Sequence, residues 1–431
     1  MIYALQVELT KKELDSIRKD IARQNSVFSD KKFLDSLYLP SNIIGRRNQA
    51  EQLLKYFESL KQGFVVPLIS VYGRSGAGKS TIVRFVCQNV QDVVSSIFVN
   101  LRKSKTIFGC TNLILSELGS EDLKSSTGLN RAVDTIRERV EEILRIENKK
   151  FFVLVLDEYD VIFSDSRGGP SDFVYKLLTL EENLRERGLW VCIITISNNA
   201  LSDYDLDDRV KSRMGNSEIF FAPYIKSEIL EILRDRANHA LCTNVDEKVL
   251  ELCADLSSGE HGDCRRAIDL LRVSAELANG SKITELHVKE AVKKLENDRI
   301  ELVLANASGQ LRRVIAALAK LVLFSQEEYH TTAEIYTEYM SVQSSQPTPL
   351  LLYRRVFDLL VEAQNAGLVV AKNRSRGRYG YATEYKLTAP TWMVGHAISK
   401  DWWYNQVGMK QDSERHMGES KKKFKAYRDG Y

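Results

Sequence analysis

The apolar positions of this chain follow two patterns, and the change from one to the other divides it. Short continuous apolar runs, bounded by polar residues, occupy 64–70, 96–100, 151–156 and 189–196. Runs of this length predict strands that are buried on both faces, as in a parallel sheet. Apolar residues at helical spacing, as in 136–144, fill stretches between them. Strands and helices that alternate in this way predict an α/β domain.

From about residue 224 onward the strand pattern stops and helical patterns follow. We expect 1–225 to hold an N-terminal arm and the α/β domain, and 226–305 to hold a small helical domain with a linker. Three helical patterns and two extended runs around a polar tip follow within 306–395, an order typical of a winged helix-turn-helix. We expect 396–431 to form a tail.

The bulk composition is that of a globular protein with two or three domains. The 431 residues are 44% hydrophobic and 28% charged, and the formal net charge is only +3. Any nucleic-acid surface would therefore have to be local. The six cysteines show no C-x-x-C pair, and no apolar run is long enough to span a membrane. We expect a protein of the reducing cytoplasm, with no membrane partner.

A glycine-rich stretch stands between the first apolar run and a helical pattern. Its glycines let consecutive backbone N–H groups curl around phosphate oxygens, and the following helix directs its positive end at them. Lys79 would reach the β and γ phosphates, and the Ser80 hydroxyl would coordinate Mg²⁺. This P-loop predicts a nucleoside triphosphate site. Its expected nucleotide contacts are Gly73, Ser75, Gly76, Ala77, Gly78, Lys79, Ser80 and Thr81.

Polar side chains end two of the other predicted strands. Asp157 and Glu158 follow one apolar run, and Asn198 follows the next along the chain. Ligands of open α/β sheets sit at the carboxyl ends of the strands. We expect Asp157 to hold Mg²⁺ together with Ser80, and Glu158 to polarise the attacking water. Asn198 is interpreted as orienting that water, and the alternative is a plain Asn turn.

Three further features each leave two interpretations open. Arg209 and Arg213 lie four residues apart on one face of a helical turn. They are either solvated charges, or one of them inserts into the nucleotide site of a neighbouring chain. Arg265 begins a predicted helix, where either a phosphate or plain solvation explains a cation. The segment from Ile44 to Arg46 either lines an adenine pocket or simply leads into the next helix.

The polar tip of the C-terminal hairpin is strongly basic. Over 370–388, five basic residues stand against one acid, which gives a local charge of +4. Arginines and tyrosines on a glycine-rich tip suit phosphate and minor-groove contacts, and two arginines at the start of the preceding helix suit the major groove. The alternative is a solvated loop. The predicted DNA contacts are Arg354, Arg355, Arg374, Arg376, Arg378 and Tyr379.

The order of these motifs resembles that of the archaeal origin-recognition and cell-division-cycle initiators, a family of AAA+ ATPases. The resemblance covers about residues 25–395, and it implies a AAA+ base with a parallel sheet, a helical lid and a C-terminal winged helix-turn-helix domain. The stretches that carry it are 73–80, 156–160, 196–198, 206–213, 221–224, 262–267 and 377–380.

The resemblance also implies roles for individual residues. Lys79 and Ser80 would carry Walker A, Asp157 and Glu158 Walker B, Asn198 sensor 1 and Arg265 sensor 2. The arginine finger would be Arg213, with Arg209 as the alternative, and Ile44, Arg46 and Tyr224 would contact the nucleotide. A DNA-binding insertion of the AAA+ domain would fall within 101–115, where Arg102, Lys103 and Lys105 are basic.

Three functions are consistent with these residues and motifs. The first hypothesis is a nucleoid-associated replication initiator, a slow ATPase that switches between ATP and ADP. It would bind double-stranded origin DNA and help to load a minichromosome-maintenance-type helicase, with initiator paralogues as further partners. The second is a regulatory ATPase whose winged helix acts in transcription or signalling. The third is a plasmid- or virus-borne regulator that kept the initiator fold.

Overall fold

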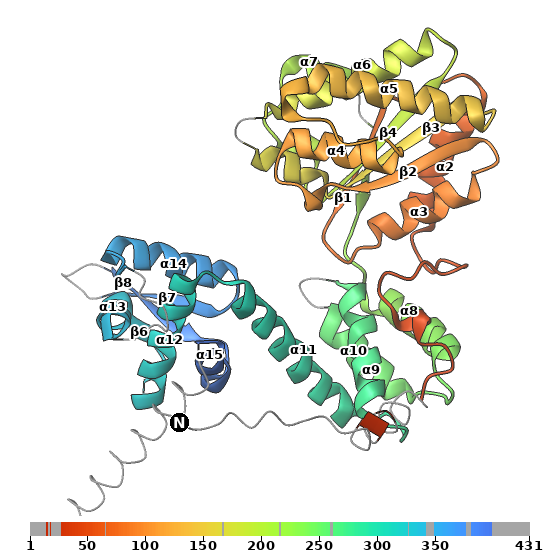
Figure 1. Ribbon diagram of the computed structural model, residues 1–431. Helices are drawn as coiled ribbons and strands as arrows, with labels where there is room; N and C mark the ends of the chain where they lie inside the picture. The colour runs from red at the N-terminus through yellow and green to blue at the C-terminus, as the bar shows by residue number, and fades with distance from the viewer. Residues whose placement is uncertain are drawn as a thin grey trace, which may run out of the picture. The chain divides into compact units, whose positions relative to one another are not determined.

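The chain consists of two compact units that meet in the sequence between Ala291 and Val292, and each is described by itself (Figure 1). The computed structural model describes residues 14–15, 18, 27–64, 66–165, 168–214, 217–258, 262–325, 327–341, 349–375 and 381–398. No helix in these ranges is long and apolar enough to cross a membrane. The domain boundaries proposed from the sequence stay predictions.

A five-stranded parallel sheet lies at the centre of the first unit. Its strands follow the order β2-β3-β4-β1-β5, and every registered pair is parallel. The predicted α/β fold is confirmed. β5 was not predicted, because it buries only Ile219 and Phe221 and so forms no continuous apolar run. The strands are β1 (Leu68–Gly73), β2 (Val94–Asn100), β3 (Phe151–Asp157), β4 (Trp190–Ser197) and β5 (Glu218–Phe221).

Helices cover both faces of this sheet (Figure 1). Along β3, Leu154 and Leu156 pack into the core beneath α4, α5 and α6, whereas Val153 and Val155 pack into the core beneath α2 and α3. Two covered faces explain why this strand is an uninterrupted apolar run. The helices are α2 (Arg47–Lys61), α3 (Lys79–Asn89), α4 (Ile107–Glu117), α5 (Leu129–Ile146), α6 (Pro170–Arg185) and α7 (Asp208–Met214). Short 3₁₀ helices are η2 (Leu101–Lys103), η3 (Ser125–Thr127), η4 (Tyr159–Ser164) and η5 (Leu201–Asp203).

A helical lid completes the first unit, and the described N-terminal segment packs against it. The Arg236 guanidinium on α8 donates to the carbonyls of Phe33 at 3.1 Å and Tyr38 at 3.3 Å. The Ser29 amide donates to the carbonyl of Ala240 at 2.7 Å. The segment that precedes the α/β domain is therefore bound to the lid. The N-terminal segment contains η1 (Lys31–Leu34). The lid consists of α8 (Lys226–Ala240), α9 (Glu247–Ser258), α10 (Cys264–Leu277) and the start of α11 (Glu285–Asn306).

The second unit confirms the predicted winged helix. Three helices pack around a core that includes Val314, Ile335, Leu360 and Tyr385, and a hairpin of β7 and β8 adds the wing. A short strand, β6, pairs with β8, so the antiparallel order is β6-β8-β7. α15 was not predicted. The elements are α12 (Gly309–Phe324), β6 (His330–Thr331), α13 (Thr332–Ser341), α14 (Tyr353–Asn365), β7 (Val369–Ser375), β8 (Tyr381–Leu387) and α15 (Thr391–Ile398).

Candidate nucleotide-binding site

The predicted glycine-rich turn joins β1 to α3 and approaches the lid closely. Gly76 and Gly78 have φ angles of 74° and 88°, in the left-handed region that favours glycine. A Cβ on Gly78 would lie 2.5 Å from the Tyr224 hydroxyl, and a Cβ on Gly76 would collide with the Asp263 carboxylate. A side chain at either glycine would therefore fill the turn. With glycine at both positions the turn is an open cradle at the N-terminal end of α3, and this end of a helix favours anions.

Lys79 is buried at the first residue of α3, and oxygen atoms surround its ammonium group. Nζ donates to the carbonyls of Gly73 at 2.6 Å and Arg74 at 2.9 Å, and it lies 3.4 Å from Oδ1 of Asn198. Burial lowers the pKa of Lys79, whereas the carboxylates that follow β3 act in the opposite direction. The lysine is thus held within the loop that would receive a phosphate group.

Two carboxylates leave the sheet at the end of β3. Asp157 is the last residue of the strand, and its Oδ1 accepts from the Glu158 amide at 3.0 Å. Glu158 has a φ of 56°, which is uncommon for a residue other than glycine and turns the chain into η4. Oε2 of Glu158 lies 3.2 Å from Nη1 of Arg102 on η2. An ion pair therefore holds the carboxylate that the sequence predicts to act on water.

Most of the side chains predicted to hold phosphate and Mg²⁺ converge on one small pocket. Backbone amides and a lysine suit phosphate, and a serine hydroxyl beside carboxylates supplies the hard oxygen ligands that Mg²⁺ prefers. The residues present therefore fit a magnesium nucleotide. The pocket is lined by Ser75, Gly76, Ala77, Gly78, Lys79, Ser80, Asp157, Glu158, Asp160, Ile196, Ser197, Asn198 and Arg265.

Asp160 belongs to this pocket, although the sequence analysis assigned it no role. Its Oδ2 accepts from Nδ2 of Asn198 at 3.2 Å and from the backbone amide of Asn198 at 3.4 Å. Oδ1 of Asp160 is buried without a hydrogen-bond partner among the described residues. The carboxylate therefore orients the Asn198 amide. Its position three residues after Asp157 was the available signal in the sequence.

A second pocket continues from the P-loop towards the lid. Ile43, Ile82 and Ile268 give it apolar walls that suit a planar base, and Asn42 and Asp235 offer polar groups for the edge of a base. Gly76, Gly78 and Arg265 line both pockets, so a base and its phosphates can occupy them together. The remaining lining residues are Ser36, Pro40, Ile44, Thr81, Tyr224, Ile232, Arg236 and Cys264.

Arg46 is buried beside these pockets and is not among the residues that line either of them. Its Nε donates to the carbonyl of Ala77 at 3.1 Å, and its Nη2 donates to the carbonyl of Ala222 at 2.6 Å. The guanidinium carbon lies 3.7 Å from the centre of the Tyr224 ring. Burial raises the pKa of Tyr224 to about 12. Arg46 thus ties the P-loop to the stretch that leads into the lid, which is a positioning role.

The first turn of α10 brings the lid against the P-loop. Asp263 caps this helix, because its Oδ1 accepts from the amides of Arg265 at 2.9 Å and Arg266 at 3.3 Å. The Cys264 amide donates to the carbonyl of Gly76 at 3.4 Å. Burial raises the pKa of the Cys264 thiol to about 12. Arg265 is exposed and reaches the phosphate pocket from the lid.

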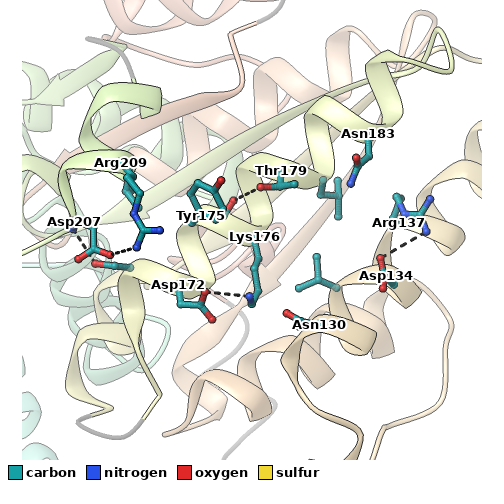
Figure 2. A pocket seen from close by; sticks show the side chains of 14 residues that line it. Asn130, Asp134, Arg137, Asp172, Tyr175, Lys176, Thr179, Asn183, Asp207 and Arg209 are labelled. Carbon is teal, nitrogen blue, oxygen red and sulfur yellow. Dashed lines mark hydrogen bonds and ion pairs between the residues drawn. The ribbon is translucent and has the colours of Figure 1, made fainter.

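Arg209 and Arg213 on α7 do not line the phosphate pocket of their own chain. Arg213 Nη1 lies 2.5 Å from Oε1 of Glu182, and Arg209 Nη2 lies 3.2 Å from Oδ2 of Asp207. Figure 2 shows Arg209 and Asp207 at one end of a separate cavity of about 460 Å³, between α5 and α6. The arginines therefore have no place in the nucleotide site described above, and a role in a neighbouring chain stays a prediction.

The predicted DNA contacts lie in the second unit. Arg354 and Arg355 are exposed in the first turn of α14, and Arg355 lies 3.5 Å from Asp358. Arg374 on β7 is exposed and lies 3.4 Å from Glu384 on β8. The other three predicted contacts, Arg376, Arg378 and Tyr379, lie outside the described residues.

The basic segment predicted to be a DNA-binding insertion forms η2 and most of α4 in the first unit. Its three basic residues, Arg102, Lys103 and Lys105, are all exposed, and Arg102 pairs with Glu158.

Three protein-family profiles match the chain in the order that the fold shows. An AAA ATPase domain matches residues 42–192, a Cdc6 AAA+ ATPase-type lid domain matches 230–293, and a CDC6 C-terminal winged helix domain matches 303–397.

Curated relatives match along nearly the whole chain. An ORC1-type DNA replication protein of Thermococcus kodakarensis is 30% identical over 399 residues, which are 90% of this chain and 94% of the relative. Another from Thermococcus onnurineus is 31% identical over 400 residues, with the same coverage of both chains.

Among solved structures, the Aeropyrum pernix ORC1 protein in complex with DNA has a TM-score of 0.74. It is 27% identical, and the match covers 89% of this chain and 99% of that one. Cdc6p from Pyrobaculum aerophilum shares the fold with a TM-score of 0.53 at 22% identity, over 88% of this chain and 100% of that one.

Proposed function

The chain belongs to the ORC1-type DNA replication proteins, and on that basis we propose that it is a nucleotide-controlled initiator of DNA replication. It binds ATP and ADP with Mg²⁺ at the pocket between the AAA+ base and the lid. It binds double-stranded origin DNA through the winged helix. The names of the relatives and the DNA in the Aeropyrum complex support this proposal.

The convergence of the base and the lid on one pocket carries the proposal. Lys79, Asp157 and Asn198 come from the sheet domain, whereas Arg265 comes from the first turn of α10. A triphosphate is bound from both sides, and a diphosphate loses the contacts made to the third phosphate. Because the lid gains contacts with one nucleotide that it lacks with the other, the nucleotide biases the position of the lid. A site of this kind suits a switch.

The residues that line the phosphate pocket can carry out ATP hydrolysis. Glu158 accepts a proton from the attacking water, and Asn198, held by Asp160, orients that water. Lys79 and Arg265 stabilise the charge of the phosphate oxygens. Mg²⁺, when bound by Ser80 and Asp157, would neutralise charge between the phosphates. We propose that turnover is slow, and the exposed ion pair of Glu158 with Arg102 contributes a small part of this restraint.

The DNA contacts proposed for the winged helix come from α14 and the hairpin. Arg354 and Arg355 lie on α14, and Arg374 lies on β7. Arg376, Arg378 and Tyr379 extend this basic segment in the sequence. Cations at these places would bind the phosphate backbone and make affinity depend on salt.

Two further partners belong to the proposal. We propose that the protein helps to load a minichromosome-maintenance-type helicase and acts with initiator paralogues. Arg213, exposed on α7 and absent from its own phosphate pocket, would reach the nucleotide of such a neighbour. Arg209 is the alternative.

A genome-wide map of the sites that the protein binds in its own cells tests the proposed function. An initiator is expected at one or a few positions that coincide with the places where DNA synthesis starts, mapped independently by marker frequency. Binding spread over promoters, with no signal at replication starts, would contradict the proposal and favour a transcriptional regulator.

A further inference from the structure

Helix α14 has two apolar faces, and only one of them packs into a core. Val356, Leu360 and Ala363 are buried in the winged-helix unit. On another side, Tyr353, Phe357 and Val361 are 46%, 39% and 38% exposed. These three residues are spaced by four and so share one face of the helix. They form what we call the apolar strip.

Two further exposed apolar residues directly precede the apolar strip in the chain. Leu350 and Leu352, just before the helix, are 47% and 79% exposed. Tyr353 is held in place by an edge-on contact with Tyr336, with ring centres 5.4 Å apart. Exposed apolar side chains that gather on one helix face are typical of a surface that meets a partner.

The cations of α14 and β7 favour DNA as that partner, and the exposed acids of α14, Asp358 and Glu362, offset only the two arginines of that helix. Arg354 and Arg355 stand beside Tyr353 in the same first turn of α14. Lys372 and Arg374 follow on β7, which directly succeeds this helix. Cations on a helix and on the strand that follows it suit contacts with the phosphate backbone of DNA. Two of these cations lie near acids of their own unit, because Arg355 is 3.5 Å from Asp358 and Arg374 is 3.4 Å from Glu384. Both arginine side chains are exposed, so these pairs are weak and each arginine can turn to a phosphate.

Inside the major groove, one base feature matches an apolar side chain. The C5-methyl group of thymine is apolar, whereas the other groups on the base edges are donors and acceptors. We propose that the apolar strip reads thymine methyl groups, so that this protein prefers DNA that carries methyls at the positions facing α14. This inference rests on the proposed DNA binding, and it adds a specificity that phosphate contacts cannot supply.

The test removes the methyl groups alone. Full-length protein is titrated into a labelled duplex of alternating dA and dT, and into the same duplex with deoxyuridine in place of thymidine, at one salt concentration. Backbone charge is the same in both duplexes. The thymidine duplex is expected to bind at least about fourfold more tightly, the factor for one buried methyl group. Conversely, adding methyl groups should tighten binding: a duplex of alternating dG and dC is expected to bind more tightly when 5-methylcytosine replaces its cytosine.

Variants connect the preference to the strip. Phe357→Ala with Val361→Ala is expected to bring the ratio of the two affinities close to one, while the salt dependence of binding is unchanged because no cation is lost. Leu302→Ala, at a residue of α11 that is 65% exposed, serves as the matched control and is expected to keep the full ratio. All three side chains are exposed, and thermal melting confirms that the variants remain folded.

The possible results separate this inference from the proposed function. Equal affinity of the unaltered protein for both duplexes overturns the inference and leaves DNA binding standing. A thymidine preference that survives Phe357→Ala with Val361→Ala also overturns it and assigns the strip to a protein partner. Failure to bind either duplex overturns the proposed function as well.

Discussion

At the scale of single residues, Glu158 is the side chain that we propose as the general base of ATP hydrolysis. It stands at the end of β3 beside the phosphate pocket, in the position of a general base. Glu158→Gln removes the basic oxygen and keeps the shape, so we expect ATP to bind normally and hydrolysis to fall by about 100-fold. Single-turnover hydrolysis and equilibrium nucleotide binding measure the two effects.

The matched control is Glu117→Gln, which changes an exposed carboxylate at the end of α4. It should leave both quantities unchanged. Hydrolysis that continues at the normal rate in the Glu158 variant would refute the role given to this residue.

Arg102 is predicted to restrain Glu158. The pair is 3.2 Å apart, and the arginine side chain is 75% exposed, so the interaction is worth only about 0–1 kcal/mol. Arg102→Ala should therefore raise the rate of ATP hydrolysis by at most about fivefold. Lys103→Ala, which removes the next cation along η2, should have no effect. A rate that falls in the Arg102 variant would show that this arginine assists the reaction instead.

The positions of single site residues can be predicted from the sequence, but their contacts across the fold cannot. Lys79 and Asp157 could be placed because each stands at a fixed distance from an apolar run that predicts its strand. The pairing of Arg102 with Glu158 joins two strand ends that are far apart in the chain and depends on the order of the strands in the sheet. Arg46 could be located by its motif, but its two carbonyl partners depend on tertiary packing.

At the scale of elements, α10 provides a reporter of lid opening. Cys264 in its first turn is buried against the P-loop, and its pKa is raised to about 12 because the thiolate would be desolvated. Few thiolates form near neutral pH, so alkylation requires the lid to open. If opening needs an empty site, ADP at 100 times its Kd should slow labelling of Cys264 by about 100-fold.

Cys242 provides the internal control for this measurement, because it is exposed and lies outside the nucleotide pockets. Mass spectrometry of peptides resolves the two sites in one experiment. Labelling of Cys242 should proceed at the same rate with and without ADP. If Cys264 is labelled equally fast in both conditions, the lid does not respond to the nucleotide.

A helix or strand can be predicted from the sequence when its buried positions form a long, regular pattern of apolar residues. β3 is covered on both faces and is apolar throughout, so it was predicted. β5 has only four residues and alternates between exposed and buried positions, which gives too little pattern to distinguish it from a loop. The buried positions of α14 predict the helix, but they do not predict its exposed apolar strip. A periodic pattern identifies the face that packs into a core and says little about a second apolar face.

At the scale of the whole molecule, the proposed nucleotide and DNA sites lie in different units of one chain. Any influence of ATP on DNA affinity must be matched by an equal influence of DNA on ATP affinity. The net charge of +3 offers little general attraction for DNA, so affinity must come from local cations. Each cation that meets a phosphate contributes to the salt dependence of binding, whichever nucleotide is present.

Arg354 is exposed in the first turn of α14, and we expect it to contribute to this salt dependence. If it contacts one phosphate, Arg354→Ala should weaken duplex binding and lower the slope of log affinity against log salt by about 0.9. Lys248→Ala on α9 removes the same charge from an exposed site in the lid and should leave the slope unchanged. Titrations at several salt concentrations, with ATP and with ADP, measure both quantities. An unaltered slope in the Arg354 variant would exclude α14 from the phosphate contacts, whereas a slope that changes only with ATP would place the switch at the DNA surface itself.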